Sequence, residues 1–387
     1  MSAPAPVYLD HAATTPLAPE VRAAMLPFLE REFGNPSSRH ALGVAAARAL
    51  EAARAEVARL CAVRPAQVTF TSGGTEANNL AVLGLARARA RLGRHVLIGP
   101  SEHPCVRDAA RALVEEGFEL ETLRLDAAGA LDLADAAARL RPDTVLVAQM
   151  LVNNEFGTLY PLARLARLVR ANAPQAVLHT DAVQAVGKAP VALAELGVHS
   201  LALSAHKFHG PKGAGALVLA EGLRPRPLVF GGEQEQGLRS GTENVAGLVG
   251  LGRAAELVRA RAPAARAHVA ALRAELRAGL GALGGAELVE PGGPGGVAEA
   301  IAAVLLPGPP AEVWQHHLEA RGVFTSVGSA CQARKGGVSP ALLALGFDER
   351  RAKQVLRLSF ARETSVDELR AGLTALATVA GELGARA

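Results

Sequence analysis

Lys207 is the side chain whose setting best suits covalent chemistry. It lies in the stretch SLALSAHKFHGPKGAG (residues 200–215), where an apolar run of strand character ends in a polar turn. Partial loss of water at a strand end lowers the pKa of an amine and favours its attack on a carbonyl group. The ordinary alternative is a lysine that packs its stem on the strand and keeps its amine in water.

The other four lysines have simpler explanations. Two fall in turns that contain Pro or Gly, one in a Gly-rich loop and one on a polar helix face; they are Lys188, Lys212, Lys335 and Lys353. Because the chain holds 36 Arg and only five Lys, we expect the nucleophilic amine, if there is one, at Lys207.

Further polar groups also follow predicted strands. Asp181 ends a strand, His103 follows another, and residues 72–75 read Ser-Gly-Gly-Thr between a strand and a helix. Two glycines at a helix N-terminus let backbone N–H groups approach an anion closely. This combination suits pyridoxal phosphate: an amine, a buried carboxylate that keeps the pyridine nitrogen protonated, an anion cup for the phosphate and a flat side chain that covers the ring. The candidates for its phosphate are Gly73, Gly74, Thr75, Ser204 and His206.

Each of these residues taken alone has an ordinary explanation. Asp181 and Thr75 can cap helices, and His103 before a proline can start one. The prediction therefore depends on their shared position after strands of one sheet.

The elements that must position these side chains alternate between strand and helix. Apolar strands are predicted at residues 67–71, 95–99, 144–149, 176–180, 200–203 and 215–219. Helical spacing is predicted at residues 17–32, 40–60, 76–91, 161–172 and 263–283. This alternation indicates an α/β fold with a mainly parallel sheet, whose ligands collect at the carboxyl ends of the strands.

Composition argues against several other classes of protein. Half of the 387 residues are apolar, yet no apolar run reaches the length of a membrane span, and the N-terminus lacks the pattern of a signal peptide. We therefore expect no membrane partner and a cytoplasmic location. The formal charge of +4 comes from Arg residues interleaved with Glu, and only 3% of residues are aromatic, so direct nucleic-acid binding is not expected. Cys61, Cys105 and Cys331 are too widely spaced to indicate a disulfide framework or a metal site.

A change in composition divides the chain. A glycine-rich polar stretch at residues 231–244 precedes the long Ala/Arg/Leu helix. We predict a boundary near Val258. The large cofactor-binding domain would span residues 16–258, and residues 1–15 and 259–387 would form a smaller α+β domain.

Nine motifs spread over nearly the whole chain carry a resemblance to a known family. They are YLDHAATTP (8–16), GNPSSRH (34–40), TSGGTEANN (71–79), SEHP (101–104), VNNEFG (152–157), HTDAVQAVGK (179–188), SAHKFHGPKG (204–213), GGEQEQGLRSGTEN (231–244) and SVGSAC (326–331). Together they resemble the cysteine desulfurases of the NifS/IscS type, which are class V, fold-type I enzymes dependent on pyridoxal 5'-phosphate.

The resemblance implies a role for each matching position. Lys207 would hold the cofactor covalently, Asp181 would contact its ring nitrogen, and His103 would stack on the ring. Asn154 and Gln184 would lie near the cofactor hydroxyl. The phosphate would be bound by Gly74, Thr75, Ser204 and His206.

The resemblance also implies a homodimer and a substrate site. Thr242 would reach the phosphate of the partner subunit. Asn35 and Arg357 would bind the substrate L-cysteine, with Arg357 on its carboxylate.

Cys331 would then be the sulfur carrier. It lies in SVGSACQARKGGVSP, a loop rich in glycine, where Arg334 and Lys335 should lower the pKa of an exposed thiol. The family reaction removes sulfur from L-cysteine and leaves L-alanine and a persulfide on this residue. An acceptor such as an iron-sulfur cluster scaffold or a tRNA-thiolation relay would then take the sulfur. Cys61 and Cys105 are interpreted as packing residues.

Two departures from the family pattern leave questions open. His11 stands where many relatives have Asn, and QARKGGVSP after Cys331 differs from the common sequence, which leaves the acceptor undecided. A selenocysteine lyase stays an alternative. A class V aminotransferase is disfavoured because transamination needs no cysteine in a mobile loop, and a non-catalytic cofactor-binding protein would not need Lys207, Asp181 and Cys331 together.

Overall fold

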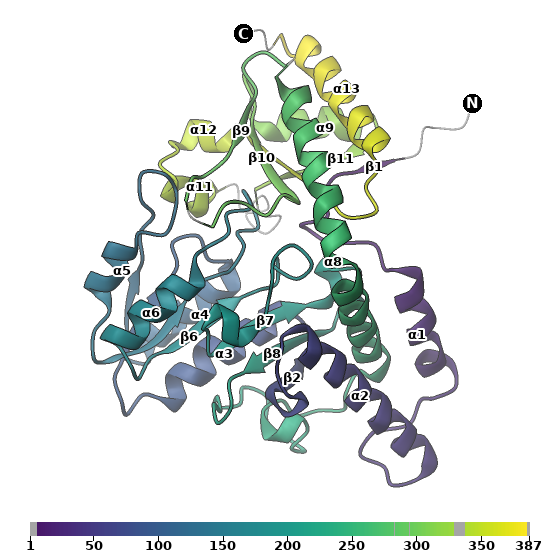
Figure 1. The fold of residues 1–387 in the computed structure, drawn as a ribbon, viewed down its shortest axis with the longest axis vertical. Helices are drawn as coiled ribbons and strands as arrows, with labels where there is room; N and C mark the ends of the chain where they lie inside the picture. The colour runs from purple at the N-terminus through teal and green to yellow at the C-terminus, as the bar shows by residue number, and fades with distance from the viewer. Residues whose placement is uncertain (1–5, 282, 294, 329–336, 385–387) are drawn as a thin grey trace.

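The computed structural model describes residues 6–281, 283–293, 295–328 and 337–384. Figure 1 shows a large α/β unit below and a smaller unit above it, with the long helix α8 (Val245–Leu280) running from one to the other. The prediction of an α/β fold with a mainly parallel central sheet and a smaller C-terminal α+β part is confirmed.

The large unit is built on a seven-stranded sheet. Neighbouring strands run parallel from β7 to β4, whereas β8 is antiparallel to both of its neighbours. The order across the sheet is β2 (Val68–Thr71), β8 (Gly215–Leu219), β7 (Ser200–Ser204), β6 (Val177–Asp181), β5 (Thr144–Ala148), β3 (His95–Ile98) and β4 (Glu119–Thr122).

Helices cover both faces of this sheet, which is why its inner strands are buried at every position. In β3, Leu97 packs in the core on one face, and Val96 and Ile98 pack in the core on the other. The first face is covered by α1 (Pro19–Glu30), α2 (Ala41–Leu60), α5 (Leu133–Arg139), α6 (Leu162–Asn172), the short α7 (Leu193–Leu196) and the first half of α8. The second face is covered by α3 (Gly74–Ala88) and α4 (Pro104–Glu115).

The edge strand β4 is absent from the sequence prediction because its side chains are not apolar. Glu119 and Glu121 lie on it and form ion pairs with Arg141 and Arg139. Charged side chains of this kind keep an edge strand from pairing with another chain. The same charged residues interrupt the apolar pattern from which strands are predicted.

The helix predicted at residues 263–283 is part of a much longer helix, α8. It begins at Val245, where Asn244 caps it by accepting a hydrogen bond from Gly247 N (3.1 Å), and it continues through Pro263. The loss of a backbone hydrogen bond at Pro263 is tolerated because the helix packs along α1 and α2 before this point and in the core of the small unit after it. The predicted domain boundary near Val258 falls inside this continuous helix, and the division into domains stays a prediction.

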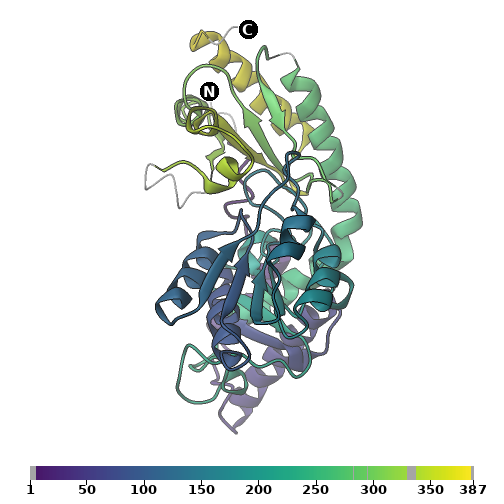
Figure 2. The ribbon, with the colours of Figure 1, turned by 90° about the vertical axis from the view of Figure 1, so that its left-hand side faces the viewer.

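The small unit holds an antiparallel sheet of β12 (Ser326–Val327), β13 (Val355–Ser359), β10 (Ile301–Leu305) and β9 (Glu287–Val289). Its core lies between this sheet and the helices α8, α9 (Ala311–Glu319) and α13 (Val366–Glu382), around the buried Trp314. The N-terminal strand β1 (Val7–Tyr8) pairs with β11 (Val323–Phe324), so the chain begins in this unit. The remaining helices are α11 (Pro340–Ala344) and α12 (Glu349–Lys353), and Figure 2 shows the unit from the side.

Three short 3-10 helices complete the described elements: η1 (Pro65–Gln67), η2 (Ala205–Lys207) and η3 (Glu235–Gly237). None of the helices in the described ranges combines the length and the apolar character that a membrane span requires.

Replacing Gly252 with alanine should destabilise the fold. A Cβ atom at this position of α8 would lie 2.5 Å from the Cα of Ala53 in α2, so the two helices would have to separate. We expect a loss of about 1–3 kcal/mol, as is typical of overpacked cores. Thermal unfolding of the variant should show a lower midpoint than that of the parent protein.

The matched control is Gly381→Ala in α13, where a Cβ atom meets nothing within 4 Å. Because alanine is the better helix former, this change should leave the midpoint unchanged or raise it, by at most about 1 kcal/mol in stability. Equal midpoints for Gly252→Ala and the parent protein would contradict the close helix contact.

Candidate active site

An anion cup lies where β2 ends and α3 begins. Gly73 and Gly74 bring the backbone close to β7, and a Cβ atom on Gly74 would meet Val183 Cγ2 at 2.6 Å. The helix starts at Gly74, earlier than predicted, so Thr75 lies in its first turn and not at its cap. A cavity of about 400 Å³ opens at this helix N-terminus, lined by Ala13, Thr14, Ser72, Gly73, Gly74, Thr75, Glu76, Ser204, His206, Lys212 and Gly213. Free N–H groups, hydroxyls and a histidine in one cavity suit a phosphate group.

Lys207 sits at the end of η2, directly after β7. Its Nζ donates hydrogen bonds of 2.7 Å to the carbonyl oxygens of both Ala12 and Ala13. Gln184 Nε2 donates to the same Ala12 oxygen at 2.8 Å, while the buried Gln184 Oε1 has no hydrogen-bond partner among the described residues. The N-terminal segment therefore brings Lys207 and Gln184 together, and Gln184 keeps one acceptor available.

Asp181 ends β6 and is only 6% exposed. Its carboxylate accepts hydrogen bonds from Val183 N (2.9 Å) and from Asn78 Nδ2 (2.8 Å). Burial raises the pKa of Asp181, while the nearby His103 and these two N–H donors oppose the rise. Asn78 is fixed in turn because its Oδ1 lies 2.9 Å from Nε2 of the buried His179.

His103 caps the N-terminus of α4. Its Nδ1 accepts a hydrogen bond from Cys105 N at 3.2 Å and lies 3.0 Å from Cys105 Sγ. Burial raises the pKa of Cys105, so Sγ is a thiol that donates to Nδ1, and the ring proton must be on Nε2. Burial lowers the pKa of His103, so the ring is neutral near pH 7. The interpretation of Cys105 as a simple packing residue is therefore incomplete, because it orients His103.

Arg357 reaches toward the site from β13 of the small unit. Its guanidinium donates to Asn154 O (2.9 Å) and to Asp10 Oδ1 (2.8 Å), and it is 3% exposed. Its Nε is buried and has no hydrogen-bond partner in the described part of the chain. Asn154 in turn lines a small cavity with Glu102 and His103. The predicted carboxylate-binding arginine is thus connected to the wall of the same site.

The structure brings together most of the predicted site residues but not all of them. Asn35 lies in the exposed turn between α1 and α2, where its Oδ1 accepts from Ser37 N (2.9 Å), and it lines none of the cavities described above. Thr242 is exposed beside the cup, in a neighbouring cavity of about 140 Å³ that shares Ser72 and Gly213 with it. Cys331 lies outside the described residues.

Three residues near the site were given no role by the sequence analysis. Asn78 donates a hydrogen bond to Asp181, and Glu102 is buried, with its pKa raised by burial and by Asp181. Lys188 is not the ordinary turn lysine that was expected, because burial lowers its pKa to about 7. Asn78, Glu102 and Lys188 each lie within a recognised motif, but only burial distinguishes them from their neighbours. Within the described ranges, no group of three or more His, Cys, Asp or Glu residues could hold a metal ion.

Comparison with known proteins agrees with this geometry. Residues 7–371 match the family described as "Aminotransferase class-V". A protein of Rhodobacter capsulatus named "Cysteine desulfurase" is 41% identical over 99% of this chain and 98% of its own length. A "Cysteine desulfurase IscS" of Dictyoglomus turgidum is 47% identical over 251 residues, which are 65% of this chain and 63% of that protein.

A solved structure named "NIFS-LIKE PROTEIN" superposes with a TM-score of 0.91 at 33% identity, over 97% of this chain and all of that one. The chain therefore belongs to the class-V aminotransferase family, and within it to the cysteine desulfurases. This family depends on pyridoxal phosphate.

The residues present fit this cofactor. The cup at α3 suits its phosphate, and Gln184 has an orphaned buried oxygen that suits its hydroxyl. Asp181 is buried, and within the described part of the chain its carboxylate is held by neutral N–H donors, which suits a protonated ring nitrogen. Lys207 is close enough to Asp181 and His103 to interact electrostatically with both.

Replacing Asn78 with alanine should weaken cofactor binding. The change removes a donor to Asp181, and a hydrogen bond to a charged group contributes about 1.5–3 kcal/mol. We expect the affinity for pyridoxal phosphate to fall roughly tenfold to a hundredfold, measured by titrating the cofactor-free protein and following the cofactor absorbance.

The control is Asn172→Ala, which removes an exposed amide at the end of α6 that donates only to Leu168 O. It should leave the affinity unchanged. An Asn78→Ala protein that binds the cofactor as tightly as the parent would show that Asn78 does not support Asp181.

Proposed function

We propose that this protein removes sulfur from L-cysteine, giving L-alanine and a persulfide on Cys331. The observation that carries the proposal is the grouping of Lys207, Asp181 and His103 beside the anion cup at α3, in a chain that belongs to the cysteine desulfurases. Pyridoxal phosphate, when bound, supplies an electron sink for the substrate's Cα.

The residues of this chain would divide the remaining tasks. Arg357 binds the substrate carboxylate. Hydrogen bonds to Asp10 and to the backbone oxygen of Asn154 already fix the position of its guanidinium group. Lys207 carries the Cα proton, and Asp181 keeps the neighbouring ring nitrogen protonated. The neutral His103 can exchange a proton with the substrate thiol through Nε2. Gly74, Thr75, Ser204 and His206 hold the phosphate.

The sulfur step would occur on the loop outside the described residues. Cys331 thiolate attacks the substrate sulfur while the C–S bond breaks, and the electron pair of that bond stays on carbon. Protonation of that carbon gives alanine, so the step needs no external oxidant or reductant. The persulfide then passes to an acceptor protein, such as an iron-sulfur cluster scaffold or a tRNA-thiolation relay, in the cytoplasm.

A homodimer would complete the cup. Thr242 is exposed at the rim of the cup, on the chain segment that follows the highly exposed Phe230 (81%). Phe33, near Asn35, is also highly exposed (75%). Large apolar side chains left in water are typical of a surface that another subunit covers. In such a dimer, Thr242 of one subunit would contact the phosphate bound by the other, and Asn35 would approach a substrate site.

The direct test is to incubate the purified holoprotein with L-cysteine and measure alanine together with protein-bound sulfane sulfur. We expect both to form in equal amounts in the first turnover. Lys207→Ala should lose alanine formation by roughly 10²–10⁴-fold or more, because the proton carrier is removed. Cys331→Ser should keep the cofactor and lose sulfane sulfur.

Lys353→Ala, on the exposed face of α12, is the control for both variants and should be fully active. Persulfide formation at the parental rate in Cys331→Ser, or alanine release by Lys207→Ala at the parental rate, would refute the assignment of that residue.

Thiol alkylation should separate the three cysteines. Burial raises the pKa of Cys61 to about 12 and also raises that of Cys105. At pH 8 only about one Cys61 in ten thousand is a thiolate, the reactive form. We therefore expect brief treatment with iodoacetamide at pH 8, read by peptide mass spectrometry, to label Cys331 and leave Cys61 and Cys105 unmodified. Labelling of Cys105 before Cys331 would contradict this order.

A further inference from the structure

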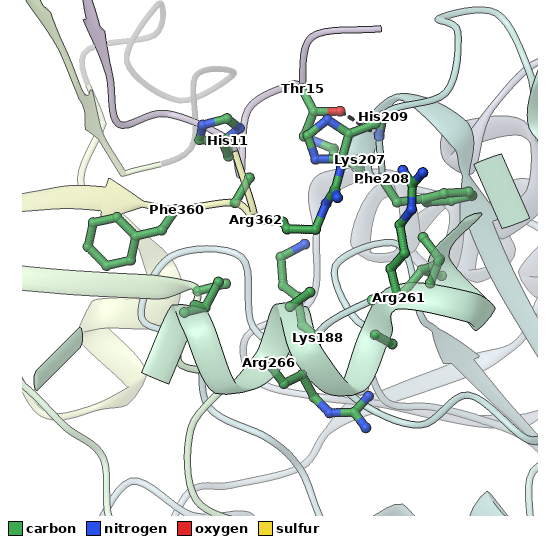
Figure 3. Close-up of a pocket in the computed structure, with 18 of the residues that line it drawn as sticks. His11, Thr15, Lys188, Lys207, Phe208, His209, Arg261, Arg266, Phe360 and Arg362 are labelled. Carbon is green, nitrogen blue, oxygen red and sulfur yellow. Dashed lines mark hydrogen bonds between the residues drawn. The ribbon is translucent and has the colours of Figure 1, made fainter. Parts of the chain in front are cut away.

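A second cavity, of about 300 Å³, lies beside Lys207 and is separate from the phosphate cup (Figure 3). It is enclosed by the N-terminal segment, by the turns that carry Lys188 and Lys207, by the middle of α8 and by the segment after β13. Its volume is at the lower end of the range of small-molecule sites, roughly 300–1,000 Å³. Of the residues that line it, only Lys207 has a role proposed above.

Apolar side chains form most of its wall. Val186, Leu257, Val258, Val269 and Phe360 line it, together with several alanines. A wall of this kind excludes water and favours a ligand with an apolar body.

Most of the charges around the cavity are already neutralised. Arg261 is bonded to Glu20 (2.7 Å), and Glu363 is shared by His209 (3.0 Å) and Arg362 (2.6 Å). The remaining acid, Glu299, is paired with Arg273 (3.2 Å). Figure 3 shows the guanidinium of Arg266 pointing away from the cavity.

Lys188 is the exception. Its amine points into the cavity toward Lys207, and among the described residues it forms no hydrogen bond or ion pair. Burial lowers its pKa to about 7, with Lys207 adding to the effect. A desolvated amine without a counter-charge is costly, and a bound anion would relieve that cost.

His11 adds a second unused donor. The residue is 5% exposed, and within the ranges that the structure describes its Nδ1 has no hydrogen-bond partner. Thr364 Oγ1 already accepts from Ala361 N (3.1 Å), so its hydroxyl proton is available for His11 Nε2 at 3.3 Å. That arrangement places the ring proton on Nδ1, where it needs an acceptor. Lys188 and His11 therefore line the same largely apolar cavity, and each has a donor with no partner among the described residues.

We propose that this cavity binds a small monocarboxylate with a short apolar chain, its carboxylate on Lys188 and His11 and its chain along Val258, Val269 and Phe360. A carboxylate accepts from both donors at once and supplies the missing negative charge. A neutral molecule of the same shape would leave the amine uncompensated, and an alkylammonium ion would repel it. The site does not depend on the desulfurase reaction.

Binding of hexanoate to the holoprotein, measured by calorimetry, tests the proposal, with 1-hexanol and hexylamine as neutral and cationic probes of equal chain length. We expect hexanoate to bind at least about tenfold more tightly than either, because a charge-assisted hydrogen bond is roughly twice as strong as a neutral one. Equal affinity for hexanoate and hexanol, or no binding of hexanoate, would overturn the proposal.

Two variants locate the site. Lys188→Met keeps the length of the side chain and should reduce the affinity for hexanoate to that for hexanol. Ala265→Phe keeps the amine but fills the cavity from α8 and should abolish binding of hexanoate. The melting temperature and the cofactor absorbance of each variant report whether it has folded.

Lys353→Met removes an exposed amine far along the chain, in α12, and should bind hexanoate like the parent protein. If Lys188→Met and Ala265→Phe both fold and still bind hexanoate with parental affinity, the carboxylate site is not this cavity. Because the readout is binding and not turnover, this result is independent of the outcome of the assay with L-cysteine.

Discussion

The burial of one carboxylate constrains the whole site. Asp181 lies at the end of an inner strand, where water cannot solvate it, and burial alone would favour its neutral form. Its negative charge can persist only if neighbouring groups replace the lost water. Asn78 and the backbone of Val183 do so directly, and His179 behind Asn78 fixes the direction of the amide. A protonated ring nitrogen would add a cationic hydrogen-bond donor to this carboxylate.

The parallel sheet explains why the other groups gather around this carboxylate. Asp181, Lys207 and His103 all follow strands that run in the same direction, so their carboxyl ends meet at one edge. The helices on the two faces provide the cup at α3 and the cap at α4 that orients His103. Arg357 comes from the other unit, and α8 runs from the large unit into the core of that one.

Much of the fold and of the candidate site could be predicted from the sequence, and the reason is physical. Inner strands are buried on both faces, so they appear as apolar runs, and the polar residues that end them are conspicuous. The edge strand β4 was missed because its charged residues form ion pairs. The start of α8 was misplaced because a proline that usually begins or breaks a helix lies in its middle, where packing on both sides compensates. Lys188 was misjudged because a turn in the sequence does not reveal what covers it in three dimensions.

The segment from Asp10 to Ala13 has a consequence for how the two halves of the site respond to each other. Asp10 holds the guanidinium of Arg357, and two and three residues later the carbonyls of Ala12 and Ala13 hold the amine of Lys207. These few residues act as a tether between the carboxylate-binding arginine and the lysine. A substrate carboxylate that competes with Asp10 for Arg357 would therefore act on the same four-residue segment whose carbonyl oxygens bind the amine.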